Sequence, residues 1–169
     1  MVTLAAPHGQ SMAAAPAVPV EVELVPRSPE QMSAFYEARG FPPAMVARLA
    51  RECFITVRIR NTGREVVWLD LAQWRFSADD RPLRRYRRDY WKKKWEEMNI
   101  PLASQSTFRW TLLPETLDYQ PGEVEGGNVI LERTSAPISL EANFDTGPDR
   151  KGTPIRLHFD QLRCAGEAP

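Results

Sequence analysis

Residues 53–63 read Cys-Phe-Ile-Thr-Val-Arg-Ile-Arg-Asn-Thr-Gly, and this stretch decides the fold class. Apolar side chains occupy every second position from Cys53 to Ile59, and mostly polar side chains stand between them. A period of two residues is typical of a β-strand with one buried face, and Asn-Thr-Gly is a turn sequence. The stretch therefore predicts a half-buried strand that ends at residues 61–63.

Similar segments recur outward from this strand in both directions, separated by turn residues such as Asp79-Asp80-Arg81-Pro82. The seven predicted strands cover residues 20–24, 53–60, 65–76, 107–112, 129–131, 138–144 and 155–159. A loop with two turn signals, Pro121-Gly122 and Gly126-Gly127, is expected before the strand at 129–131. Because helices do not alternate with these strands, we expect an antiparallel two-sheet sandwich and not a parallel sheet.

Residues 28–52 break the strand pattern and predict a helical insertion. Ser28-Pro29-Glu30-Gln31 combines an N-cap serine, a proline at the first helical position and a glutamine at the capping-box position. Pro42-Pro43 opens a second short helix, in which Met45, Val46 and Leu49 share a face with Cys53. We expect this helical insertion to be one of the contact surfaces of the domain.

The composition limits the class of protein. The chain has 169 residues, 43% hydrophobic and 26% charged, which suits one globular domain. The formal net charge is zero, so overall charge gives no argument for nucleic-acid binding. No apolar run reaches the roughly 20 residues that span a bilayer. We expect a flexible Ala/Pro-rich arm at residues 1–19, a sandwich domain at 20–165 and a tail at 166–169.

The order of residues resembles that of immunoglobulin-like accessory domains on bacterial exported proteins and lipoproteins. The resemblance lies in the strand and turn at 54–63, in Trp68-Leu-Asp-Leu71 and its following turn, and in the Pro121-Gly122 segment that precedes an apolar strand. It covers residues 54–144, with helical insertions at about 28–52 and 81–98 as departures. It implies an immunoglobulin-like sandwich that serves as a binding or structural module and carries no catalytic residues.

The second insertion, Arg81 to Met98, is the most distinctive segment of the chain. Basic and aromatic side chains are interleaved along it, and at helical spacing Tyr86 lies one turn before Tyr90, as Trp91 does before Trp95. Two interpretations are open: a helix that packs its aromatic side chains on the sandwich with its cations in water, or a contact surface for a partner. The candidate partner-binding residues are Arg84, Arg85, Tyr86, Arg87, Arg88, Tyr90, Trp91, Lys92, Lys94 and Trp95.

The chain has two cysteines, Cys53 at the start of the second predicted strand and Cys164 after the seventh. If seven strands alternate in direction, these two positions lie at the same end of the sandwich, so a disulfide is permitted. The alternative is a buried thiol and a loose terminal thiol. A disulfide would place the protein in an oxidising compartment.

These observations predict a non-enzymatic, exported β-sandwich module of the bacterial periplasm or exterior, with a cytoplasmic location as the alternative. We expect another protein or a second copy of the chain as its partner, no cofactor and no metal. The alternative function is binding of anionic ligands, namely nucleic acid, lipid headgroups or polysaccharide, through residues 84–95. Nucleic acid is the less favoured partner, and peripheral contact with a membrane stays open.

Overall fold

The computed structural model describes residues 17–166 of the chain. The predicted arm falls almost wholly on residues 1–16 and most of the predicted tail on residues 167–169, so both predictions lie outside the described residues. The described residues contain the predicted sandwich and both of its insertions.

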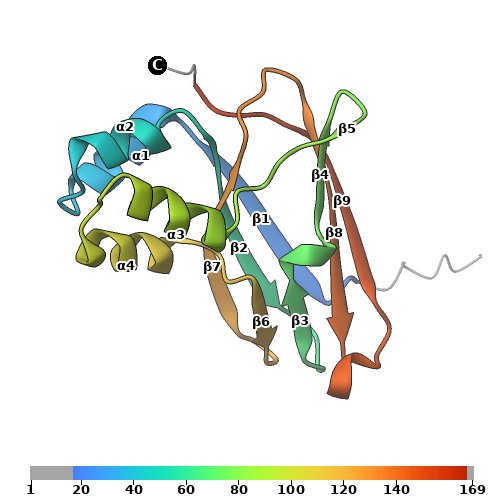
Figure 1. The fold of residues 1–169 in the computed structure, drawn as a ribbon. Coiled ribbons are helices and arrows are strands. Elements are labelled where there is room, and N and C mark those ends of the chain that lie inside the picture. The colour runs from blue at the N-terminus through green and yellow to red at the C-terminus, as the bar shows by residue number, and fades with distance from the viewer. Residues whose placement is uncertain (1–16, 167–169) are drawn as a thin grey trace, which may run out of the picture.

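Residues 17–166 form two antiparallel sheets that face each other (Figure 1). The first has the order β1-β2-β7, with β1 Val20–Arg27, β2 Cys53–Asn61 and β7 Val124–Leu131. The second contains β3 Val67–Asp70, β4 Arg75–Ala78, β5 Arg81–Pro82, β6 Thr116–Tyr119, β8 Ile138–Thr146 and β9 Ile155–Leu162. The predicted mainly β, two-sheet antiparallel sandwich is confirmed.

Strand β8 is the centre of the second sheet. Its partner on one side is β9, and on the other side β4 pairs with its first half and β3 with its last residues. Strands β5 and β6 extend the sheet beyond β4 and β3.

The alternation in residues 53–59 correctly predicted a strand with one face in the sandwich core. Cys53, Ile55, Val57 and Ile59 are all buried between the two sheets, where they meet side chains such as Leu140 of β8. The opposite face of β2 carries Phe54, which is buried against the helices. The sandwich core and the helical layer therefore lie on opposite faces of the same strand.

One predicted strand is divided in two. The segment expected at residues 65–76 forms β3 and β4, separated by a turn of 3₁₀ helix at Leu71–Gln73. Asp70 caps this turn, because its carboxylate accepts a hydrogen bond from the Ala72 N–H (3.0 Å). This division and the short strands β5 and β6 add three strands to the predicted seven, and the strand predicted at residues 107–112 is absent, which leaves nine within residues 17–166.

The strand predicted at residues 107–112 is wrong, because this segment belongs to helix α4, Leu102–Thr111. Phe108 and Leu112 lie four residues apart and are buried, whereas Trp110 between them is exposed. Apolar residues at alternate positions can satisfy either period over so short a run, and here the helical spacing of Phe108 and Leu112 is the one that is used.

The loop predicted at Gly126-Gly127 is also wrong, because both glycines lie inside β7. A Cβ atom on Gly127 would lie 2.4 Å from the backbone nitrogen of Leu113, and one on Gly126 would lie 2.4 Å from the Val57 carbonyl oxygen. The glycines thus permit close approach of two backbones to β7, and Leu113 N–H donates to the Asn128 carbonyl there (3.1 Å).

Four α-helices within residues 17–166 gather beside the first sheet (Figure 1). They are α1 Pro29–Glu37, α2 Pro43–Leu49, α3 Arg88–Glu97 and α4. The predicted capping box is present at α1: Ser28 Oγ accepts from Gln31 N–H (3.3 Å), and Gln31 Oε1 accepts from Ser28 N–H (2.9 Å). None of the helices in this part of the chain has the length and apolar character to cross a membrane.

The helices enclose a second core of their own against Phe54 and Ile130 of the first sheet. Its largest members are aromatic, and Tyr36 of α1 stacks on Phe41 with ring centroids 4.8 Å apart. The buried residues of this helical core are Met32, Tyr36, Phe41, Met45, Val46, Leu49, Phe54, Trp91, Trp95, Ile100, Phe108, Leu112 and Ile130.

Candidate functional site

The basic aromatic segment is helical only in its second half. Residues 83–87 are not helical, and the segment runs beside the end of β7, where Tyr86 N–H donates to the Ile130 carbonyl (2.9 Å) and Glu132 N–H donates to the Arg84 carbonyl (2.9 Å). Helix α3 then begins at Arg88. The segment therefore carries the chain from the second sheet across to the helical layer.

The two tryptophans of α3 are buried in the helical core. Trp91 and Trp95 are each 1% exposed, and their rings stack with centroids 5.0 Å apart. Phe108 of α4 packs edge-on against both rings. These two candidate residues hold α3 against α4. Because their side chains are buried, they influence a partner only through the surface residues of α3 that they position.

Arginines stack on the tyrosines of the segment. The guanidinium of Arg84 lies 4.9 Å from the ring centroid of Tyr86 and 5.1 Å from that of Tyr90. Arg48 of α2 donates to the Tyr90 hydroxyl (2.8 Å) and forms an ion pair with the buried carboxylate of Glu52. Part of the positive charge of the segment is thus used within the fold.

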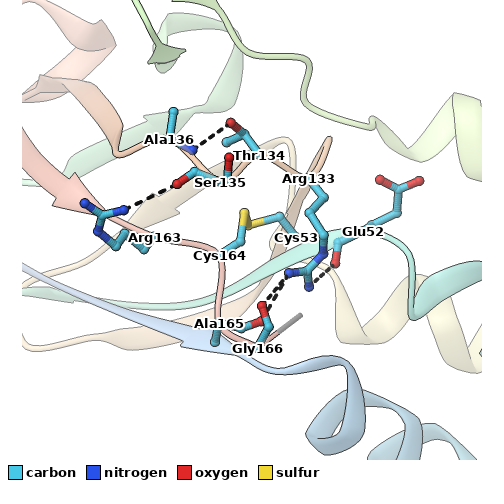
Figure 2. Close-up of a disulfide and its surroundings, with 10 residues drawn as sticks. All are labelled: Glu52, Cys53, Arg133, Thr134, Ser135, Ala136, Arg163, Cys164, Ala165 and Gly166. Atoms are coloured by element: carbon cyan, nitrogen blue, oxygen red, sulfur yellow. Dashed lines mark hydrogen bonds between the residues drawn. A yellow bond between two sulfur atoms is a disulfide. The ribbon is translucent and has the colours of Figure 1, made fainter. Parts of the chain in front are cut away.

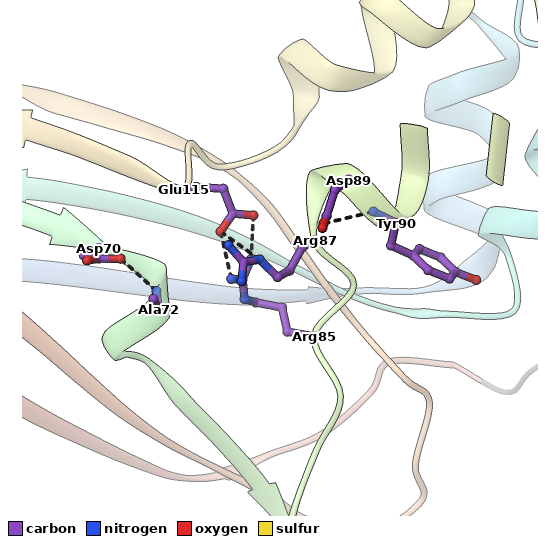
Figure 3. A network of polar contacts seen from close by, with 7 residues as sticks. All are labelled: Asp70, Ala72, Arg85, Arg87, Asp89, Tyr90 and Glu115. Atoms are coloured by element: carbon purple, nitrogen blue, oxygen red, sulfur yellow. Dashed lines mark hydrogen bonds and ion pairs between the residues drawn. The ribbon is translucent and has the colours of Figure 1, made fainter. Parts of the chain in front are cut away.

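Glu115 is shared by two candidate residues, Arg85 and Arg87 (Figure 3). Both carboxylate oxygens accept from the Arg85 guanidinium, at 2.9 and 2.8 Å, and Arg87 Nε lies 3.8 Å away. Burial acts to raise the pKa of Glu115, but the hydrogen bonds and charge of Arg85, with the charge of Arg87, outweigh it and hold that pKa below its ordinary value. The carboxylate fixes the crossing segment to the chain that enters β6.

The two candidate lysines pair along their own helix. Lys92 Nζ lies 2.6 Å from Glu96, and Lys94 Nζ lies 2.8 Å from Glu97. Arg84 and Arg88 differ from the other basic candidates, because within residues 17–166 no carboxylate lies within 4.0 Å of either guanidinium, and only Arg84 stacks on tyrosine rings. The Arg88 guanidinium instead meets a backbone carbonyl. Its Nη2 donates to the Leu112 carbonyl (3.3 Å). Burial and the nearby charge of Arg109 lower the pKa of the Arg88 guanidinium.

A groove of about 630 Å³ lies between α3 and α4. Its exposed apolar side chain is Leu102, which is 81% exposed at the start of α4, and buried aromatic rings lie beneath it. Trp110, near the end of α4, is 79% exposed. The lining residues are Arg88, Asp89, Trp91, Lys92, Trp95, Leu102, Gln105, Ser106, Phe108, Arg109 and Leu112.

The sequence did not reveal α4 as part of this site, because its residues were interpreted as a strand. It also missed Glu115 and Arg48, which are distant in sequence from the segment that they hold. Pro101, followed by Phe108 and Leu112 at the spacing of one helical turn, was the available signal for a helix.

The predicted disulfide between Cys53 and Cys164 is present, with Cα atoms 5.3 Å apart (Figure 2). It joins the first residue of β2 to the chain just beyond β9, and so connects the two sheets. Arg133 reinforces this junction. Its guanidinium donates to the carbonyls of Glu52 (3.0 Å), Ala165 (3.3 Å) and Gly166 (3.1 Å).

Comparison with known proteins adds no family. No family model matches the sequence. No curated protein matches it at a significant level.

Two solved structures are similar at a low level. One is the Bacillus subtilis protein ycdA, provisionally described as a lipoprotein: it has 12% identity and a TM-score of 0.39, over 66% of this chain and 30% of that one. The other is a FixG-related protein from Vibrio parahaemolyticus, with 11% identity and a TM-score of 0.38, over 87% of this chain and 98% of that one. The chain thus spans less than a third of the Bacillus protein, and the resemblance to immunoglobulin-like accessory domains stays a prediction.

Proposed function

We propose that this chain is an exported, non-enzymatic module, extending over residues 20–165, that binds another protein through the helical layer on its first sheet. The contact surface consists of the groove between α3 and α4 and the exposed side of α4 next to it. The observation that carries this proposal is the exposure of two large apolar side chains, Leu102 and Trp110, on α4. Tryptophan is among the residues that contribute most to protein interfaces.

The use of polar groups supports a binding role over catalysis. Arg85, Arg87 and Glu115 are engaged with one another, and Lys92 and Lys94 pair with acids of α3. Burial raises the pKa of Tyr36 and Tyr119, which are fully buried within the two cores, and of Tyr86, which stacks with Arg84. These tyrosines thus serve the packing of the fold.

The disulfide supports export. Disulfides form and persist in oxidising compartments such as the periplasm and the cell exterior, and are rare in the cytosol. The Cys53–Cys164 bridge encloses most of the sandwich, with 111 residues of sequence separation.

A site-specific photo-crosslinker tests the binding surface. A photoreactive phenylalanine analogue is placed at Trp110 in the full chain, expressed in the organism that produces it, and a matched variant carries it at the exposed Glu141 of β8, on the second sheet. We expect a discrete crosslinked product from position 110 that is missing from position 141. Identical products from both positions, or none from position 110, would contradict the proposal. The mass of the product distinguishes a second copy from a different protein.

A further inference from the structure

The groove between α3 and α4 has an apolar floor and a positively charged wall. Trp91, Trp95 and Phe108 lie at its base, where each is only 1% exposed, and Leu102 is its large exposed apolar side chain. Arg88 and Arg109 both line it, and they are close enough that the charge of Arg109 lowers the pKa of Arg88. Asp89 is the one acid among the lining residues.

These two arginines differ from the other cations nearby. Lys92, which also lines the groove, pairs with Glu96 at 2.6 Å, and Glu115 is engaged by Arg85 and Arg87. Within residues 17–166, neither Arg88 nor Arg109 has a carboxylate within 4.0 Å. Two like charges thus line one groove without an ion pair to its single lining acid, Asp89, an arrangement that an incoming anion would stabilise.

Three buried hydrogen-bond donors of residues that line the groove are unpaired. Arg88 Nε, Trp91 Nε1 and Trp95 Nε1 are buried and have no acceptor among the described residues. Buried donors normally have a partner, so the cluster of three beside one groove is a second sign that a ligand completes it. Carboxylate oxygens accept from guanidinium and indole N–H groups alike.

We propose that this groove binds an acidic, amphipathic segment of a partner protein, with an apolar side chain of the partner against Leu102 and a carboxylate at Arg88 and Arg109. The proposal rests on the proposed function, and it adds the chemistry of the partner. The segment is recognised by an exposed apolar side chain and by charge of opposite sign, so it is both apolar and acidic.

The spacing of the exposed apolar side chains on α4 favours a polypeptide over a small amphiphile as the ligand. Leu102 and Trp110 lie eight residues apart on one helix, or about 12 Å along its axis. Leu102 lines the groove and Trp110 lies outside its lining, so exposed apolar surface continues along α4 beyond the groove. That extent suits a peptide, whereas a small ligand is mostly enclosed by its pocket. Nucleic acid would need a row of unpaired cations to neutralise its phosphates, whereas Arg85, Arg87, Lys92 and Lys94 are each paired with a carboxylate.

An unbiased peptide library, selected against the immobilised full chain with its disulfide intact, tests the inference. We expect the selected peptides to be enriched in Asp and Glu together with Leu, Phe or Trp. Fluorescence anisotropy of labelled peptides should show binding that is at least about tenfold weaker to Arg109→Glu, with no change for Arg156→Glu on β9. Both arginines are exposed, so circular dichroism should show that both variants keep the fold.

Exchanging the charges of the peptide and the protein is the most direct test of the ionic contact. A selected peptide whose Glu is replaced by Lys should bind Arg109→Glu more tightly than it binds the natural chain. The indole N–H resonances of Trp91 and Trp95 should also shift when the acidic peptide binds.

The other outcomes distinguish failure of this inference from failure of the proposed function. Selected peptides without acidic enrichment, or insensitive to Arg109→Glu, overturn the inference, and the proposed function still stands if Trp110→Ala weakens them. A library that yields no binder removes both proposals. Decanoate that shifts the two indole resonances and displaces the selected peptides at a lower concentration would assign the groove to an amphiphile and overturn the peptide proposal.

Discussion

Glu115 is a single half-buried carboxylate that serves two arginines, Arg85 and Arg87. Glu115→Gln removes the counter-charge of both and leaves the half-buried Arg85 without an ionic partner. We expect a loss of about 2 kcal/mol in the free energy of unfolding at about pH 7, between the values for exposed and buried pairs. Urea denaturation measures it, with Glu96→Gln in the exposed pair on α3 as a control expected to lose less than about 0.5 kcal/mol.

The same pair gives a pH dependence with a definite sign. The pKa of Glu115 in the folded chain is lowered from its ordinary value of 4.5. A lowered pKa adds stability that is present above the unfolded value and is lost as the pH falls through the folded value. The difference between the natural chain and Glu115→Gln should therefore be constant above about pH 5 and shrink as the pH falls below 4.5. A difference that grows on acidification would contradict this assignment.

Asn61, the first residue of the Asn-Thr-Gly turn, is more than a turn former. Its fully buried side chain donates to the carbonyls of Glu65 (2.7 Å) and Tyr119 (2.8 Å) and accepts from Gly63 N–H (2.9 Å). Asn61→Ala leaves three backbone groups without partners, and we expect a loss of about 2–4 kcal/mol. Thermal unfolding checks it against Thr62→Ala at the exposed neighbouring residue, which should stay within about 0.5 kcal/mol of the natural chain.

Helix α3 carries a buried tryptophan, Trp95, and helix α4 an exposed one, Trp110. Trp95→Ala removes a ring from the middle of the helical core, so we expect a loss of about 3–5 kcal/mol. Trp110→Ala, at an exposed position of the next helix, should change the free energy of unfolding by less than about 0.5 kcal/mol. Chemical denaturation compares the two directly. Equal losses would mean that Trp110 packs into the fold and does not form part of a free surface.

Strands and helices differed in how far the sequence could predict them. Alternation was sufficient for β2 and β8, since both bury one face in the sandwich core and solvent or helices meet the other. Phe108, Trp110 and Leu112 satisfied that same alternation within a helix, because over five residues an i, i+4 pair also lies at even spacing. Capping chemistry identified α1 correctly, since its signal is local.

The candidate site was less predictable than the fold for a physical reason. The interleaved charges and rings of residues 84–95 were visible in the sequence, but their burial and pairing depend on Glu115, Arg48 and Phe108, which meet them only in three dimensions. Whether the segment contacts a partner stays a prediction.

At the scale of the whole molecule, the two sheets share a core and one covalent connection. Strand β9 pairs only with β8, and Cys164 at its end is bonded to Cys53 at the start of β2 in the opposite sheet. Arg133 spans the same junction through three carbonyl groups, so part of it persists without the disulfide. The bond is therefore expected to limit the unfolded chain more than to shape the folded one.

Removing this bond should weaken the whole molecule and not unfold it locally. Reduction of the natural chain, or the double substitution Cys53→Ala and Cys164→Ala, should lower the free energy of unfolding by about 2–5 kcal/mol, because a loop of this length restricts the denatured chain strongly. The check is the urea midpoint with and without a reductant, to which the double variant should be indifferent. Hydrogen exchange then locates the effect: a global loss raises the exchange of β2 and β9 together, whereas faster exchange confined to β9 would show that the bond only anchors the last strand. The first result would make an oxidising compartment a condition for the stability of the module, in agreement with its proposed export.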